Sequence, residues 1–387
     1  MRRLAIAERP DWQATAEACG FNFHHMYGEA YWDETACFAF TLEEIERDIE
    51  EPSRELHAMC LDLADRAAAD EELLERLGVP EPFRDYVAGS WHKREPTVFG
   101  RFDLAYRGDG PAKLLEYNAD TPTGLYEAAY FQWVWLEEAK SLGIVAATSD
   151  QFNSIQDELI AAYGALPKRS ILHFSTDGGS VEDFGTITYM MDCALQAGQR
   201  PKFVDIAAIG HDLADRFTDQ DDLVIDVLAN IYPWEWLFTE EFGPKIPRSG
   251  TRFIEPAWKA MLSTKAILPL LWERHPGHPN LLPAFFEGDP RAGGLTDHVR
   301  KPLFSREGAN ISLNRGGRTV AHIDGPYGGQ DRWVRQQATE LFSSAHGHAV
   351  LGTWIVGDEP CGLGMREDAS PITMNLSRFV PHIIVEE

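Results

Sequence analysis

Residues 99–118 restrict the possible folds of this chain more than any other segment. Aromatic, aliphatic and polar residues alternate on both sides of Asp109-Gly110, a dipeptide that favours a two-residue turn, so the segment predicts a β-hairpin. Side chains two residues apart in a strand lie on the same face. Arg101 and Asp103 therefore share one face of the first predicted strand.

The position of the turn decides which residues face each other across this hairpin. If Asp109-Gly110 forms the turn, Asp103 lies opposite Glu116 and Arg101 lies opposite Asn118. Two opposed carboxylates repel each other, which predicts a cation between them, and oxygen ligands of this kind suit Mg²⁺. If Gly108-Asp109 forms the turn instead, Arg101 faces Glu116 in an ordinary ion pair. The spacing alone leaves both registers open.

Composition narrows the class of protein. The chain has 387 residues, of which 44% are hydrophobic and 25% charged, as expected for a soluble globular protein with two or three subdomains. Its formal net charge of −26 argues against nucleic acid and anionic membranes as partners and favours a cationic partner. Simple solubility is the commoner reason for such acidity.

The sequence predicts neither export nor membrane insertion. No apolar run approaches the roughly 20 residues that cross a bilayer, and the N-terminus reaches Glu8 and Pro10 before an apolar signal region forms. The five cysteines are odd in number and contain no CxxC, which is typical of reduced thiols. We therefore expect a cytoplasmic protein.

Residues 170–206 predict a β-loop-α-β unit. A strand at 170–174, a loop at 175–179, a helix at 181–197 and a second strand at 202–206 favour a parallel α/β arrangement. The loop lacks both a lysine after its glycines and a GxGxxG pattern, so it is not a P-loop or a dinucleotide fingerprint.

Two later segments carry further candidate residues. A strand predicted to end at Lys301 is followed by a polar loop with Gly308, and backbone amides in such a loop can bind phosphate while a lysine supplies charge. On its own this is a weak signal. Near the C-terminus, residues 349–356 and 361–366 flank a turn, which predicts a second hairpin that ends at Arg366.

Taken in order, these features resemble the synthetase part of glutathionylspermidine synthase, within the ATP-grasp superfamily. The resemblance covers nearly the whole chain, and although each motif is short, the ordered set is fairly specific. The chain opens directly in synthetase-like sequence, so we expect a stand-alone relative without the amidase domain. The matching motifs are Arg-x-Asp at 101–103, Glu-x-Asn at 116–118, Lys265 before Ala-Ile-Leu-Pro, Lys301-Pro, Arg-x-Gly-x-Asn-Ile at 306–311 and the hairpin that ends in Arg366.

The resemblance implies a fold and a division of the chain. The expected class is α/β (α+β), with an ATP-grasp fold and a Rossmann-like α/β subdomain. Residues 1–145 would contain helices and the catalytic hairpin. Residues 146–245 would form the Rossmann-like substrate subdomain, and residues 246–387 the nucleotide-binding part.

The resemblance also implies roles for the motif residues. Asp103, Glu116 and Asn118 would bind Mg²⁺, while Arg101 and Arg366 would stabilise the transferring phosphoryl group. The implied nucleotide-binding residues are Lys265, Lys301, Arg306, Gly308, Asn310 and, as a further contact, Gln337.

The implied activity is an ATP- and Mg²⁺-dependent ligation of a carboxylate to an amine through an acyl phosphate. The carboxylate would be glutathione or another peptide, and the acidic composition favours a polyamine or other cationic amine as acceptor. Three alternatives stay open: a ligase acting on a peptide or protein C-terminus, a phosphotransferase with a non-carboxylate acceptor, and a nucleotide-binding regulatory protein that does not catalyse. The oligomeric state is left undetermined.

Overall fold

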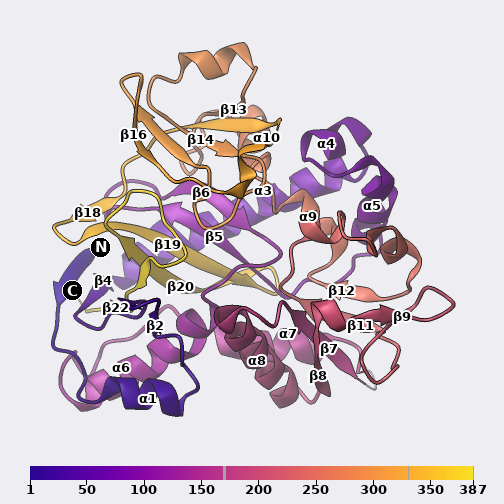
Figure 1. The fold of residues 1–387 in the computed structure, drawn as a ribbon. Helices are drawn as coiled ribbons and strands as arrows, with labels where there is room; N and C mark the ends of the chain where they lie inside the picture. The colour runs from indigo at the N-terminus through magenta and orange to yellow at the C-terminus, as the bar shows by residue number, and fades with distance from the viewer. Residues whose placement is uncertain (169–170, 330, 387) are drawn as a thin grey trace.

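The computed structural model describes residues 1–168, 171–329 and 331–386. A sheet in the order β21-β20-β19-β5-β6, with β18 paired to β19, lies at the centre of the molecule (Figure 1). It joins a hairpin from the first third of the chain to strands from the last eighth. The strands are β5 (Phe99–Ala105), β6 (Lys113–Asn118), β18 (Phe342–Ser344), β19 (Gly347–Val356), β20 (Glu359–Asp368) and β21 (Arg378–Phe379).

The register of the first hairpin is the one that opposes two carboxylates. Asp103 pairs with Glu116, and Arg101 pairs with Asn118. The register then shifts between Asp103 and Leu104, where β6 has a bulge. The prediction that places Asp103 opposite Glu116 is confirmed.

The predicted two-residue turn at Asp109-Gly110 is wrong, because residues 106–112 form a longer loop. Contacts with distant parts of the chain hold this loop in place. Asn280 donates its side-chain amide to the Ala112 carbonyl at 2.8 Å and accepts the Leu114 amide at 2.8 Å. Tertiary contacts therefore replace the local turn.

The second predicted hairpin is confirmed. β19 and β20 pair antiparallel around a tight turn at Gly357 and Asp358, both of which have positive φ, at 57° and 69°. Such φ values match the right-handed twist of a hairpin. β19 also pairs with β5, so Arg366 on β20 belongs to the same sheet as Arg101.

The predicted β-loop-α-β unit belongs to a four-stranded parallel sheet in the order β12-β11-β7-β8. Ser170, where the first strand was expected to begin, lies outside the described residues. α7 and α8 pack against each other beside this sheet (Figure 1). The elements are α7 (Ile155–Ala165), β7 (Leu172–Thr176), α8 (Val181–Gln196), β8 (Pro201–Asp205), β11 (Val227–Asn230) and β12 (Arg252–Ile254).

A five-stranded antiparallel sheet in the order β13-β17-β14-β15-β16 carries Lys301. It lies beside the β5–β6 hairpin, with α10 against β13 and β17 (Figure 1). The elements are α10 (Ile267–Arg274), β13 (Ala284–Phe286), β14 (His298–Pro302), β15 (Ser312–Arg315), β16 (Arg318–His322) and β17 (Trp333–Gln337). The mixed α/β fold class is therefore confirmed.

Both ends of the chain meet in one small sheet, in which β1 and β22 flank the buried strand β4. In the described part of the chain, none of the helices combines the length and apolarity that membrane crossing requires. The other α-helices and β-strands of the described residues are β1 (Arg2–Ala5), α1 (Trp12–Ala18), β2 (His25–Met26), β3 (Glu29–Ala30), β4 (Ala36–Phe40), α2 (Leu42–Ile45), α3 (Glu51–Ala67), α4 (Glu71–Arg76), α5 (Arg84–His92), α6 (Gln132–Ser141), β9 (Gly210–His211), β10 (Phe217–Thr218), α9 (Trp234–Leu237) and β22 (His382–Ile384).

His382 on β22 predicts acid sensitivity of this terminal sheet. The ring is fully buried, accepts the Phe152 amide at Nε2 (3.1 Å) and contacts Gln132 Oε1 through Nδ1 (3.0 Å), and burial lowers the pKa of His382 to about 3. The unfolded chain protonates this histidine below a pH of about 6.5, so stability falls as the pH drops through that value. Between pH 7 and pH 5 the wild type should lose about 2 kcal/mol more unfolding free energy than His382→Gln, which keeps a donor and an acceptor.

Urea unfolding of both proteins at the two pH values measures this difference. Equal losses in the wild type and His382→Gln would contradict the prediction.

Candidate active site

One face of the β5–β6 hairpin carries a dense set of polar side chains. Arg101 donates Nε to Asp103 Oδ1 at 2.7 Å and Nη2 to Asp103 Oδ2 at 3.0 Å, and its Nη1 donates to the Thr123 carbonyl. Asn118 Nδ2 lies 3.1 Å from Asp103 Oδ2. Gly352 of β19 pairs with Asp103, and a Cβ at this position would lie 2.8 Å from Arg101 Cδ. The glycine therefore leaves room for the arginine.

Two lysines approach the other carboxylate of the hairpin. Lys265 Nζ lies 3.1 Å from Glu116 Oε2, and Lys301 Nζ donates to the Leu115 carbonyl at 2.8 Å and to Gln336 Oε1 at 2.9 Å. Burial alone would raise the pKa of Glu116, but Lys265 and Lys301 outweigh it and lower that pKa to about 2. Burial lowers the pKa of Lys301 to about 8. Glu116 is therefore ionised at neutral pH.

Asp103, Glu116 and Asn118 present the oxygen ligands that Mg²⁺ prefers. Each carboxylate faces a cation of the chain, Arg101 on Asp103 and Lys265 on Glu116, so the chain itself balances both negative charges. Within the described ranges, no group of three or more His, Cys, Asp or Glu side chains could hold a metal ion alone. Two carboxylates and an amide nevertheless fit Mg²⁺, which keeps several positions for water and phosphate oxygens.

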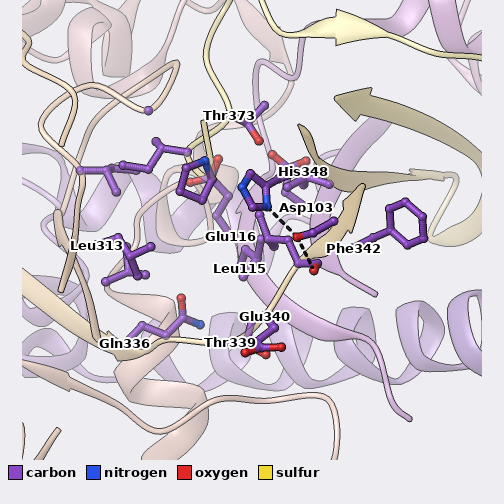
Figure 2. A pocket seen from close by; sticks show the side chains of 18 of the residues that line it. Asp103, Leu115, Glu116, Leu313, Gln336, Thr339, Glu340, Phe342, His348 and Thr373 are labelled. Carbon is purple, nitrogen blue, oxygen red and sulfur yellow. Dashed lines mark hydrogen bonds between the residues drawn. The ribbon is translucent and has the colours of Figure 1, made fainter. Parts of the chain in front are cut away.

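A pocket of about 800 Å³ opens between the hairpin and the five-stranded sheet. In Figure 2, Leu313 and Phe342 lie on opposite sides of this pocket, and Asp103 and Glu116 appear between them. Lys301 also lines it. Its size and its apolar walls with a charged floor are typical of a small-molecule or cofactor site.

A second, smaller cavity of about 110 Å³ adjoins the first. Asp103, Glu116 and Gly308 line both, so the two spaces meet at the hairpin. Arg101, Arg306 and Arg366 converge on the smaller cavity from three different segments of the chain. Such a concentration of guanidinium groups is suited to phosphate and carboxylate groups.

The loop that contains Arg306 closes one side of this cavity. Arg306 Nη2 donates to Thr121 Oγ1 at 2.5 Å, and its Nε lies 3.6 Å from Glu235 Oε1. Gly308 has a φ of 73°, and a Cβ there would lie 2.6 Å from the Thr373 carbonyl oxygen, so glycine is required. Asn310, in the same loop, accepts the Tyr327 backbone amide through its side-chain Oδ1 at 2.7 Å.

Arg366 is held by backbone groups beside an acidic cluster. It donates Nε to the Ser377 carbonyl at 2.9 Å and lies 5.1 Å from the centre of the Tyr31 ring. Tyr31 donates its hydroxyl to Glu127 at 2.5 Å and to Glu182 at 3.4 Å. Burial raises the pKa of Glu127 and raises that of Glu182 to about 8.

The two glutamines of β17 have different environments. Gln337 is exposed and lines the large pocket, whereas Gln336 is buried, accepts from Lys301 and donates to the Leu114 carbonyl at 2.8 Å. Strand alternation from the buried Val334 would have singled out Gln336 as the inward residue. The acidic cluster at Tyr31, Glu127 and Glu182 carries no comparable sequence signal, because long-range folding alone brings it together.

Comparison with known proteins identifies relatives along nearly the whole chain. The family described as glutathionylspermidine synthase preATP-grasp matches residues 3–385. A Haemophilus influenzae protein, whose name assigns it provisionally as an acid–amine ligase, is 40% identical over 403 residues that cover 100% of both chains.

Two longer relatives match in part. Trypanothione synthetase of Crithidia fasciculata is 27% identical over 82% of this chain and 52% of its own. The bifunctional glutathionylspermidine synthetase/amidase of Escherichia coli is 25% identical over 89% and 59%. This chain thus spans between about half and three-fifths of the length of these two relatives.

A solved structure supports the fold. The glutathione synthetase-like effector of Globodera pallida superposes with a TM-score of 0.59 at 11% identity, over 90% of this chain and 89% of that one.

Proposed function

The chain belongs to the glutathionylspermidine synthase preATP-grasp family and is an amine–acid ligase, and we propose that it uses ATP and Mg²⁺ and proceeds through an acyl phosphate. One observation carries this proposal. The large pocket and the small cavity meet at Asp103 and Glu116. Three arginines line the small cavity, and Lys265 and Lys301 approach Glu116. A ligase that phosphorylates a carboxylate needs this juxtaposition of a nucleotide site and an anion site.

The nucleotide would occupy the large pocket. Its base would lie between apolar side chains such as Leu313 and Phe342, and its phosphates would reach the hairpin beside Lys301 and Lys265. Mg²⁺ held by the ligand set described above would neutralise phosphate charge. The lysines supply the remaining positive charge from the protein side.

In the first step, a substrate carboxylate oxygen would attack the γ-phosphorus, and ADP would leave. Charge on the transferring group spreads over its equatorial oxygens, which suits the planar guanidinium groups of Arg101 and Arg366 in the small cavity. In the second step, the amine would attack the acyl carbon, phosphate would leave and the amine nitrogen would lose a proton. The product is an amide.

Water would hydrolyse the acyl phosphate, so the small cavity needs a cover. The loop with Arg306 and Gly308 already borders it, and its contacts to Thr121 and Glu235 bring it over the hairpin. We infer that this loop excludes water during the reaction.

Glutathione or another peptide is the proposed carboxylate, and a polyamine or other cationic amine is the proposed acceptor. The names of the relatives and the net charge of −26 support this choice.

A screen of carboxylates against amines for ADP release tests the proposal, with glutathione and spermidine as the first pair. ADP should appear only when ATP, Mg²⁺, carboxylate and amine are all present, and mass spectrometry should find the two substrates joined with loss of water. EDTA should abolish the signal, and excess Mg²⁺ should restore it.

Other outcomes would favour the alternatives. ADP release with a peptide or protein C-terminus but not with glutathione would favour a peptide ligase. A phosphorylated acceptor without amide would favour a phosphotransferase. Thermal stabilisation by nucleotide without turnover on any pair would favour a regulatory protein.

A further inference from the structure

A buried ion pair lies directly behind the catalytic hairpin. Lys259 belongs to the short 3-10 helix η6 (Ala257–Met261), and Glu255 lies just before it. Their side chains are 2% and 1% exposed, and Lys259 Nζ lies 3.6 Å from Glu255 Oε2. Burying two ions is costly, and an apolar pair of similar size is often no less stable. Stability alone therefore gives no reason for this pair.

The lysine links the two strands of the hairpin. Its Nζ donates to the Phe99 carbonyl at 3.3 Å and to the Ala119 carbonyl at 3.1 Å. Phe99 begins β5, and Ala119 directly follows the end of β6. One ammonium group thus holds both strands at the open end of the hairpin, the end opposite the 106–112 loop.

The glutamate fixes the same end of β5. Its Oε1 accepts the amides of Val98 at 2.9 Å and Phe99 at 3.1 Å, and its Oε2 accepts the Thr97 hydroxyl. Glu255 therefore binds the donors of the segment whose carbonyl Lys259 binds. Together the two side chains satisfy four backbone groups at the open end of the hairpin.

This contact lies close to the reacting groups in sequence but on the other side of the sheet. Arg101 lies two residues after Phe99, and Asn118 immediately precedes Ala119. Lys259 Nζ lies 5.6 Å from the centre of the Tyr117 ring, which alternation turns away from Asn118. The ion pair thus contacts the back of the strands whose front carries the catalytic set.

We propose that Glu255 and Lys259 are positioning residues that hold β5 and β6 in the relative placement required for phosphoryl transfer. Neither lines the pockets described above, so they act through Arg101 and Asn118 rather than on substrate. The inference rests on the proposed function, because the effect of the positioning is measured as the rate of that reaction. A misplacement of about 1 Å at distant supporting residues can cost ~100-fold in rate.

Lys259→Met tests the proposal against Arg9→Met. Arg9, outside the β5–β6 hairpin, forms a comparably buried ion pair with Glu34 at 2.5 Å and a second with the half-exposed Glu138 at 2.7 Å, so its loss also leaves a buried carboxylate uncompensated. We expect Lys259→Met to lower kcat by ~10- to 100-fold with the KM for ATP within about threefold of wild type. Arg9→Met should lower the melting temperature without changing kcat.

A second readout does not depend on turnover. Mn²⁺ binding in the presence of a non-hydrolysable ATP analogue, followed by electron paramagnetic resonance, should weaken by about tenfold in Lys259→Met and stay unchanged in Arg9→Met. If the wild type released no ADP with any substrate pair, the proposed function would fail while this measurement still tested the positioning.

The double variant Glu255→Gln/Lys259→Met guards against misfolding, because it buries no unpaired charge. Its glutamine can still accept the Val98 and Phe99 amides through Oε1. It should recover stability relative to Lys259→Met but keep the low kcat and the weak Mn²⁺ binding. Recovery of kcat with stability, or a Lys259→Met protein that matches Arg9→Met in both kcat and Mn²⁺ affinity, would overturn the proposal.

Discussion

Arg101→Ala is expected to lower the rate of ADP formation by ~10²- to 10³-fold, the usual cost of losing one preorganised donor to a developing negative charge. Arg101 is fixed before any ligand arrives, by two hydrogen bonds to Asp103, one to Thr123 and the space left by Gly352. Little reorganisation is therefore needed when phosphate binds. Arg101→Lys should recover only part of the rate, because an ammonium group cannot make the bidentate contact.

Arg291→Ala is the matched control for this prediction. Arg291 makes the same two-residue pairing with Asp289, Nε to Oδ1 at 3.0 Å and Nη2 to Oδ2 at 2.6 Å, but on the exposed surface. It should turn over at the wild-type rate. Circular dichroism and thermal melting of both variants separate lost chemistry from lost folding, and wild-type turnover by a folded Arg101→Ala protein would refute the assignment.

Asp103→Asn is expected to reduce ADP formation by roughly 100-fold or more, since even residues that only support metal ligands typically cost 10- to 100-fold. Asparagine keeps the shape of the side chain and can accept from Arg101, so the hairpin should stay folded. What it removes is one of two opposed negative charges, and with it much of the attraction for a divalent cation.

The Mg²⁺ dependence of ADP release measures this effect. Asp103→Asn should need a much higher Mg²⁺ concentration for half-maximal rate, whereas Asp289→Asn on the surface should behave as wild type. An unchanged Mg²⁺ dependence in Asp103→Asn would mean that this carboxylate is not a ligand.

Patterns of neighbouring residues in the sequence predicted the two hairpins and the parallel β-loop-α-β unit. Alternation placed the strands of both hairpins, turn residues placed the turn of the second one, and the order strand, loop, helix, strand placed the parallel unit. The register that pairs Asp103 with Glu116 was one of two open alternatives. It holds although the turn predicted for it does not form, because a bulge after Asp103 restores the pairing.

The remainder depends on contacts between distant segments. Asn280 shapes the loop at 106–112, and no local rule links these two parts of the chain. In the sequence, nothing distinguishes Lys259 from other lysines in helices. Its buried contacts with the Phe99 and Ala119 carbonyls become visible only in the folded chain. Gln336 is different, since strand alternation would have selected it over Gln337.

The topology of the central sheet has a consequence for the order in which the enzyme assembles. β5 is translated early, but its partner β19 and the strand β20 that bears Arg366 are translated much later. In the separate small sheet, β22 pairs with β4 later still. Contacts of such long sequence separation form slowly, because loop-closure entropy is lost before they stabilise the chain. A nascent chain therefore carries the β5–β6 hairpin before its partner strand β19 and before Arg366.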